Sequence, residues 1–149
     1  MPDTVLPGHG SGGKLMNDLI HDTIRETLGS ESIQLDDSAI LQLPGQQIAF
    51  TTDSYTITPI EFRGGNIGSL AVNGTVNDLA VMGAEPLYLS CSIILEEGMP
   101  LDELKRVLQS MRAAADYAGV SIVTGDTKVV PRGKGDKMYI NTAGIGIFN

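Results

Sequence analysis

Carboxylate side chains are the residues of this 149-residue sequence best placed to do chemistry. The candidates lie near expected strand ends or within an expected helix: Asp36, Asp37, Asp53, Asp78 and Asp126. Alone, each is most simply a turn or helix-capping residue. Two carboxylates about 4 Å apart repel by about 4 kcal/mol at an effective dielectric near 20, so a group of three to five needs a bound cation. Hard oxygen ligands with no His or Cys nearby favour Mg²⁺ bridging phosphates over zinc.

Among these residues, Asp78 is the strongest candidate for a carboxylate that binds a ligand. It follows Asn77 within NGTVNDLAVMGAEP, an otherwise apolar predicted helix rich in small residues. A carboxylate buried there without a partner would be costly, and few basic residues are placed to pair with it. We therefore expect Asp78 to bind a ligand.

The glycine-rich segment LPGHGSGGKL, residues 6–15, offers a second chemistry, the binding of phosphate by backbone amides. Its glycines match both the G-x-G-x-x-G spacing of a dinucleotide fold and the G-x-x-x-x-G-K of a P-loop. Both motifs need a preceding strand, which the short, proline-flanked residues 1–7 do not supply. Leu15 also replaces the P-loop Ser or Thr. Two interpretations remain: a disordered terminal arm, or a mobile lid over a nucleotide, with Lys14 at the head of an anion-favouring helix.

The two histidines and the cysteine are weaker candidates for functional residues than the aspartates. His9 lies in the arm and could touch a phosphate, whereas His21 is expected on a helix surface. Cys91 is the single cysteine and lies in an apolar strand, so we expect it in the core. One cysteine excludes an intramolecular disulfide and makes the cytoplasm the default compartment.

Three helices and five strands are expected to position these residues. The helices are predicted over Lys14–Leu28, with Gly29 after its end, over Asn66–Met82, and from Pro100 at its first position to Gly119. The strands are predicted over Ala39–Leu43, Gln46–Thr52, 86–95, 120–130 and Lys137–Phe148. This order favours an α+β fold, a mixed four-to-six-stranded sheet with helices on one face. A dimer packed sheet on sheet would cover the other face.

Composition limits the function further. The formal net charge of −8 argues against nucleic acid or an anionic membrane as a partner. No apolar run approaches the roughly 18–20 residues of a membrane helix. We also expect no secretory signal, because the first residues show no basic region followed by an apolar one. Residues 1–149 are expected to form one domain, with 1–13 as a flexible glycine-rich arm.

Several long motifs together closely resemble a known family. They are GHGSGGK, LDDSA, TTDSYTITPIEFRGGNIGSLAVNGTVNDLAVMGAEP, LSCSIILEEGMP and IVTGDTKVV. They resemble the N-terminal half of the HypE family, hydrogenase maturation factors also called carbamoyl dehydratases. That family is similar to aminoimidazole ribonucleotide synthetase, selenophosphate synthetase and thiamine-monophosphate kinase. GHGSGGK and TGDTKVV favour the HypE family, and the arm lacks the reactive cysteine expected of a selenophosphate synthetase.

The resemblance implies a fold like the N-terminal domain of aminoimidazole ribonucleotide synthetase (PurM), with a sheet-to-sheet dimer forming a barrel. ATP and Mg²⁺ would be the cofactors. Catalytic roles would fall to Lys14, Asp78 and Lys128, and metal binding to the five aspartates above. The nucleotide would contact Gly10, Gly12, Gly13, Lys14, Asp53, Asn77, Thr124 and Gly125.

The implied reaction is the ATP-dependent dehydration of a carbamoyl group on a C-terminal cysteine to a thiocyanate, the source of the cyanide ligands of [NiFe] hydrogenase. A carbamoyltransferase and an iron-scaffold protein would be partners. The family's C-terminal domain and cysteine tail are absent from these residues, so we expect a domain that is inactive alone. The alternatives are a dimerisation or docking module, and a small-molecule kinase or synthetase of the same superfamily.

Overall fold

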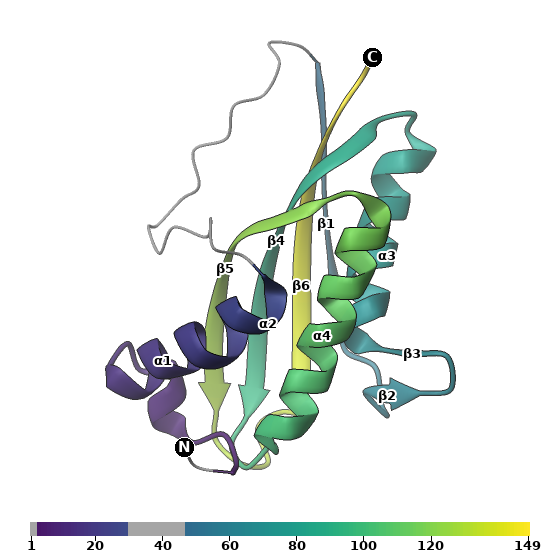
Figure 1. The fold of residues 1–149 in the computed structure, drawn as a ribbon. Helices are drawn as coiled ribbons and strands as arrows, with labels where there is room; N and C mark the ends of the chain where they lie inside the picture. Colours follow the sequence, from purple (N-terminus) through teal and green to yellow (C-terminus); the bar gives the residue numbers. More distant parts are fainter. Residues whose placement is uncertain (1–2, 30–46) are drawn as a thin grey trace.

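A four-stranded mixed sheet forms the centre of the molecule (Figure 1). This computed structural model describes residues 3–29 and 47–149. The strands are β1 (Ile48–Tyr55), β4 (Glu85–Glu96), β5 (Ser121–Val130) and β6 (Met138–Ile147), in the spatial order β1-β6-β4-β5. β6 pairs antiparallel with both β1 and β4, whereas β5 pairs parallel with β4. The predicted strand Ala39–Leu43 lies outside the described residues.

Helices cover one face of this sheet, which confirms the predicted α+β class (Figure 1). α3 (Ile67–Val81) and α4 (Leu101–Ala118) lie side by side over it. A short ribbon of β2 (Glu61–Phe62) and β3 (Gly65–Asn66), which was not predicted, leads into α3. Asn66 caps α3 by accepting bonds from the amides of Gly68 and Ser69. Pro100 caps α4 and is not its first helical residue, a correction of one position.

The predicted helix Lys14–Leu28 forms in three continuous pieces. These are α1 (Lys14–Asp18), a π-helical segment η2 (Leu19–Arg25) and α2 (Glu26–Leu28), and a 3₁₀ turn, η1 (Pro7–Gly10), precedes them. Gly29 ends the helix in the left-handed conformation, with φ of 65°. The π segment is a departure from the prediction, and such segments occur frequently at functional sites.

The core lies between the sheet and the helices. Alternate residues of β4, from Leu89 through Ile93 to Leu95, are buried against the helices. The apolar stripe of α4 meets them, with Leu104, Leu108 and Met111 fully buried. This stripe is the one that the sequence predicts most clearly.

The opposite face of the sheet carries no helix of the described chain (Figure 1). Phe50 on this face is 68% exposed, and Ile48 and Ile94 are also exposed. The sheet-to-sheet dimer that would cover these side chains stays a prediction. None of the described helices is long and apolar enough to cross a membrane.

Candidate functional site

Two candidate carboxylates, Asp53 of β1 and Asp78 of α3, lie at the same height along these two neighbouring elements. Tyr55 at the end of β1 packs against Gly74 of α3. Asp53 lies two residues before Tyr55, about 7 Å along a strand, and Asp78 lies four residues after Gly74, about 6 Å along a helix. Because β1 and α3 run in opposite directions (Figure 1), both steps lead the same way. Asp53 therefore faces the part of α3 that carries Asp78.

Both carboxylates of this pair are exposed to solvent, as is Asn77. The expectation that Asp78 is buried is wrong, because the buried stripe of α3 runs through Ala71, Thr75 and Leu79 and leaves it outside. Its ligand role stays a prediction. Oδ1 of Asp53 accepts a hydrogen bond of 2.8 Å from the amide of Ser54, which fixes one end of that carboxylate. Asp53 also lies inside β1 and not at its predicted end.

Tyr55 places a buried hydroxyl beside this pair. The residue is 8% exposed, and its hydroxyl is the one buried side-chain polar atom without a hydrogen-bond partner in the described chain. Burial raises the pKa of Tyr55, the Thr75 hydroxyl opposes that shift, and the charges of Asp53 and then Asp78 add to it. Leaving a buried hydroxyl unpaired costs about 1–3 kcal/mol.

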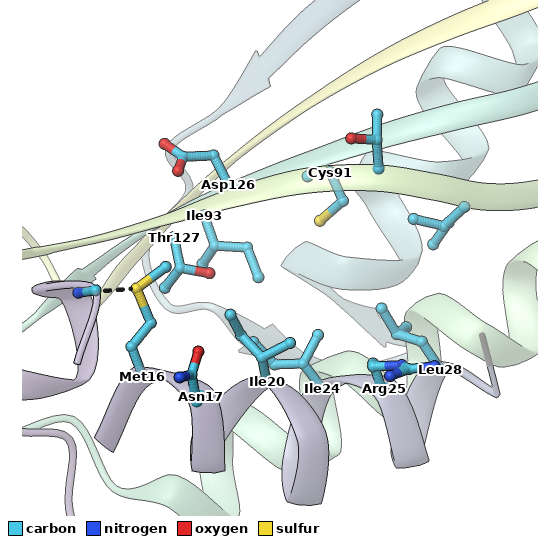
Figure 2. A pocket seen from close by; sticks show the side chains of 14 residues that line it. Met16, Asn17, Ile20, Ile24, Arg25, Leu28, Cys91, Ile93, Asp126 and Thr127 are labelled. Carbon is cyan, nitrogen blue, oxygen red and sulfur yellow. Dashed lines mark hydrogen bonds between the residues drawn. The ribbon is translucent and has the colours of Figure 1, made fainter. Parts of the chain in front are cut away.

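A second group of predicted residues gathers on β5 and the glycine arm. Gly12, Thr124, Gly125 and Asp126 all line one pocket of about 360 Å³ (Figure 2). The pocket lies between β4 and β5 on one side and the α1–η2–α2 helix on the other. Its walls are mostly apolar and include Met16, Ile20, Ile24, Ile93 and Ile122. Its size is within the range of small-molecule sites.

The side chains of β5 divide between the two faces of the sheet. Thr127 points into the pocket, whereas the Asp126 carboxylate points away from it (Figure 2). Lys128 shares the face of Asp126, with its Nζ 3.9 Å from Asp126 Oδ2. Lys14 is exposed at the start of α1, directly after Gly13. Lys14 and Lys128 are therefore the exposed lysine side chains of this group.

The glycine arm is anchored over most of its described length. The amide of Val5 donates to the Met99 carbonyl at 2.8 Å, and Gly10 packs against Val129 of β5. His9 is 1% exposed, and its Nδ1 accepts a bond of 2.9 Å from the Leu6 amide. The interpretation of His9 as a phosphate contact is wrong, because the ring is part of the packing. Residues 11–13 are exposed, and mobility of the arm stays a prediction.

The candidate aspartates that the structure describes do not meet at one point within a single chain. β1 and β5 are opposite edges of the sheet, with β6 and β4 between them, so Asp53 and Asp126 lie on strands about 14 Å apart. Asp36 and Asp37 lie outside the described residues. Within residues 3–29 and 47–149, no three His, Cys, Asp or Glu side chains are close enough to hold a metal ion.

Cys91 is a core residue, as predicted. It lies in β4 with its thiol toward the pocket (Figure 2), and burial raises its pKa to about 12. The thiol is therefore protonated at neutral pH and is a poor nucleophile.

Sequence reasoning missed Tyr55 and the pocket, whereas the small residues of the predicted helix over Asn66–Met82, Gly74 among them, did indicate a close approach to the sheet. A signal for Tyr55 existed, because residues two apart in a strand share a face and Asp53 was already a candidate. The pocket left no such signal, since it depends on how the first helix packs against β4 and β5.

Fold and site together define the class of protein. The family described as AIR synthase related protein, N-terminal domain, matches residues 35–148, and the chain belongs to it.

Within that class the chain is similar to HypE proteins, which confirms the resemblance seen in its motifs. It is 53% identical over 144 residues to the carbamoyl dehydratase HypE of Escherichia coli K12, covering 93% of this chain and 43% of that protein. A crystal structure of the hydrogenase maturation protein HypE in complex with ATP matches with a TM-score of 0.94 and 54% identity, over 98% of this chain and 44% of that one. A HypE–HypF complex matches with a TM-score of 0.68 and 45% identity, over 91% and 43%. The chain thus spans less than half the length of these relatives.

Proposed function

We propose that this chain is the ATP-binding domain of a carbamoyl dehydratase resembling HypE. The observation that carries the proposal is that Asp53 and Asp78 lie at the same height on the neighbouring β1 and α3, in a fold whose relative, 54% identical to this chain, was solved with ATP. The relatives' names supply the reaction class.

The donor set of this pair fits magnesium that arrives with a nucleotide. Mg²⁺ is usually held by one or two carboxylates plus substrate phosphates, and not by an all-protein cage. Asp53 and Asp78 would provide the two carboxylates, and Asp36, Asp37 and Asp126 remain proposed further ligands. Bound magnesium would offset the charge that develops on the transferred phosphoryl group.

The proposed reaction activates a carbamoyl group carried on a cysteine sulfur. The amide oxygen attacks the γ-phosphorus of ATP, and ADP leaves. Loss of the oxygen as phosphate, together with the nitrogen-bound protons, then leaves the nitrile of a thiocyanate. Lys14 and Lys128 would stabilise the phosphoryl charge, while Asn77, Thr124 and the glycines at 10, 12, 13 and 125 would contact the nucleotide. The carrier cysteine lies outside these residues in the proposal, because Cys91 is their only cysteine and is buried.

The proposed partners follow from the relatives and from the uncovered sheet face. HypF is proposed as the carbamoyltransferase that loads the cysteine, by analogy with the HypE–HypF complex. A second copy of the chain is proposed to cover Phe50 and its neighbours, and an iron-scaffold protein to receive the cyanide. The cytoplasm is the proposed compartment.

Calorimetric titration with Mg-ATP tests the metal assignment. Asp78→Asn should weaken binding at least about tenfold, because a hydrogen bond or contact to a charged group contributes about 1.5–3 kcal/mol. Asp102→Asn, an exposed carboxylate in the first turn of α4, is the matched control and should bind like the wild type. Equal affinities of Asp78→Asn and the wild type would contradict the assignment.

A dimerisation module is the second candidate function, favoured by the exposed apolar side chains on the uncovered sheet face. A wild-type chain that dimerises but takes up no Mg-ATP would support this candidate over the first.

A further inference from the structure

The hydroxyl of Tyr55 is a polar group without a use in the described packing. It is buried, and no described group meets the distance and angle of a hydrogen bond to it. The Thr75 hydroxyl and the Asp53 carboxylate nevertheless lie close enough to affect its pKa. Thr75 is already bonded to the Thr142 hydroxyl, which in turn donates to the Ala71 carbonyl. A phenylalanine would fill the same space without burying an unpaired oxygen.

Gly74 provides the space for this hydroxyl. It lies in the middle of α3, where glycine is a poor helix former. A Cβ at this position would collide with the Tyr55 hydroxyl, and would also lie 3.1 Å from Cζ of the ring. Two unfavourable features, a glycine within a helix and an unpaired hydroxyl, thus occur together at one contact.

The Asp53 carboxylate is the acceptor within reach. Asp53 and Tyr55 share one face of β1, as residues two apart in a strand do. The Ser54 amide already holds Oδ1, and no described donor bonds to Oδ2. A hydroxyl donated to Oδ2 would fix the carboxylate at both oxygens.

We propose that Tyr55 is a positioning residue for the magnesium site, its hydroxyl donating a hydrogen bond to Asp53 Oδ2 when the cation is bound. In the cation-bound state this bond holds Asp53 toward Asp78, so that both carboxylates contact the ion. Tyr55 acts through Asp53 and does not touch the reacting atoms. This inference rests on the proposed function, which makes Asp53 and Asp78 the metal ligands.

The test measures the Mg²⁺ concentration that half-saturates ATP binding, with ATP fixed and Mg²⁺ varied. Tyr55→Phe should raise this concentration about tenfold, the effect of one hydrogen bond to a charged group. The affinity for ATP at saturating Mg²⁺ should return to the wild-type value. The unfolding temperature without ligand should be equal or higher, because the hydroxyl makes no bond there. Tyr117→Phe is the control, since Tyr117 is 95% exposed on α4.

Gly74→Ala gives an independent approach to the same hydroxyl. Its Cβ should displace the phenol oxygen and raise the Mg²⁺ requirement in a chain that retains Tyr55. In a Tyr55→Phe background the same change should add little to that requirement, because no hydroxyl is left to displace. Simple addition of the two effects would contradict the proposal.

The outcomes separate this inference from the proposed function. If Asp78→Asn raises the Mg²⁺ requirement while Tyr55→Phe does not, the positioning role is overturned and the proposed function stands. A loss of ATP affinity in Tyr55→Phe that excess Mg²⁺ does not restore would also overturn it. If the wild-type chain binds no ATP at any Mg²⁺ concentration, both proposals fail together.

Discussion

Burial determines which individual side chains are free for chemistry. Asp53 and Asp78 are exposed and carry no described ion pair, so their oxygens are open to a cation. His9 and Cys91 are the reverse, since both are buried and serve packing. This agrees with the sequence analysis, which placed the aspartates above His9 and Cys91 as candidate functional residues.

The buried thiol of Cys91 should lower the free energy of unfolding at high pH. The ordinary pKa of the thiol is 9.0, and burial raises it to about 12. Below pH 9 the thiol is protonated in both states, whereas between pH 9 and 12 only the unfolded chain loses the proton. The free energy of unfolding therefore falls as pH rises, by up to about 1.4 kcal/mol per pH unit from this group.

Denaturant unfolding of the wild type and Cys91→Ala at pH 8.5 and 10.5 measures that loss. The difference between their free energies of unfolding should shrink by roughly 2 kcal/mol at the higher pH, because alanine has no proton to lose. A difference that stays constant would show that the thiol titrates normally.

Among the elements, α3 packs closely against both the sheet and α4. Gly68 lets α3 approach α4 closely, and Gly74 lets it approach β1. Thr75 ties the same helix to Thr142 of β6. The position of Asp78 relative to Asp53 therefore depends on close contacts on more than one side of α3.

Gly68→Ala tests the contact between α3 and α4. The new Cβ would lie 2.5 Å from the Val107 carbonyl oxygen and 2.6 Å from Met111 Cγ. We expect a loss of about 1–3 kcal/mol in the free energy of unfolding from overpacking, although alanine favours helix by about 1 kcal/mol. Asn73→Ala, at an exposed position of α3, should be neutral or stabilising. Urea unfolding measures both, and a Gly68→Ala chain as stable as the wild type would contradict the close contact.

Local patterns predicted the helices and the long strands well. The apolar stripe from Leu104 to Met111 and the runs that became β4, β5 and β6 are encoded in neighbouring residues. The ends are less certain from sequence, and Pro100 differs by one position for that reason. The π segment in η2 depends on packing and has no simple sequence signal.

For the whole molecule, strand order is what the sequence could not supply. β6 is the last strand of the chain, yet it lies between β1 and β4. No local period encodes that long-range pairing, and it separates Asp53 from Asp126. The expectation of one aspartate cluster assumed that aspartates near the ends of different predicted strands also lie close together in space.

The uncovered face of the sheet predicts self-association. Phe50→Glu places a charge on that face and should shift the chain toward monomer in sedimentation measurements, because burying an unpaired charge is costly. Tyr117→Glu on α4 is the matched control and should leave the dimer intact. A wild-type chain that remains a monomer at high concentration would contradict a dimer formed through the sheet.

Binding of ATP to the wild-type chain, measured by calorimetry with Mg²⁺ and again with excess EDTA, tests the central claim most directly. The proposal predicts saturable binding with Mg²⁺ that is lost or greatly weakened when the chelator removes the cation. Absence of binding with Mg²⁺, or equal binding with EDTA, would contradict a magnesium-dependent nucleotide site at Asp53 and Asp78.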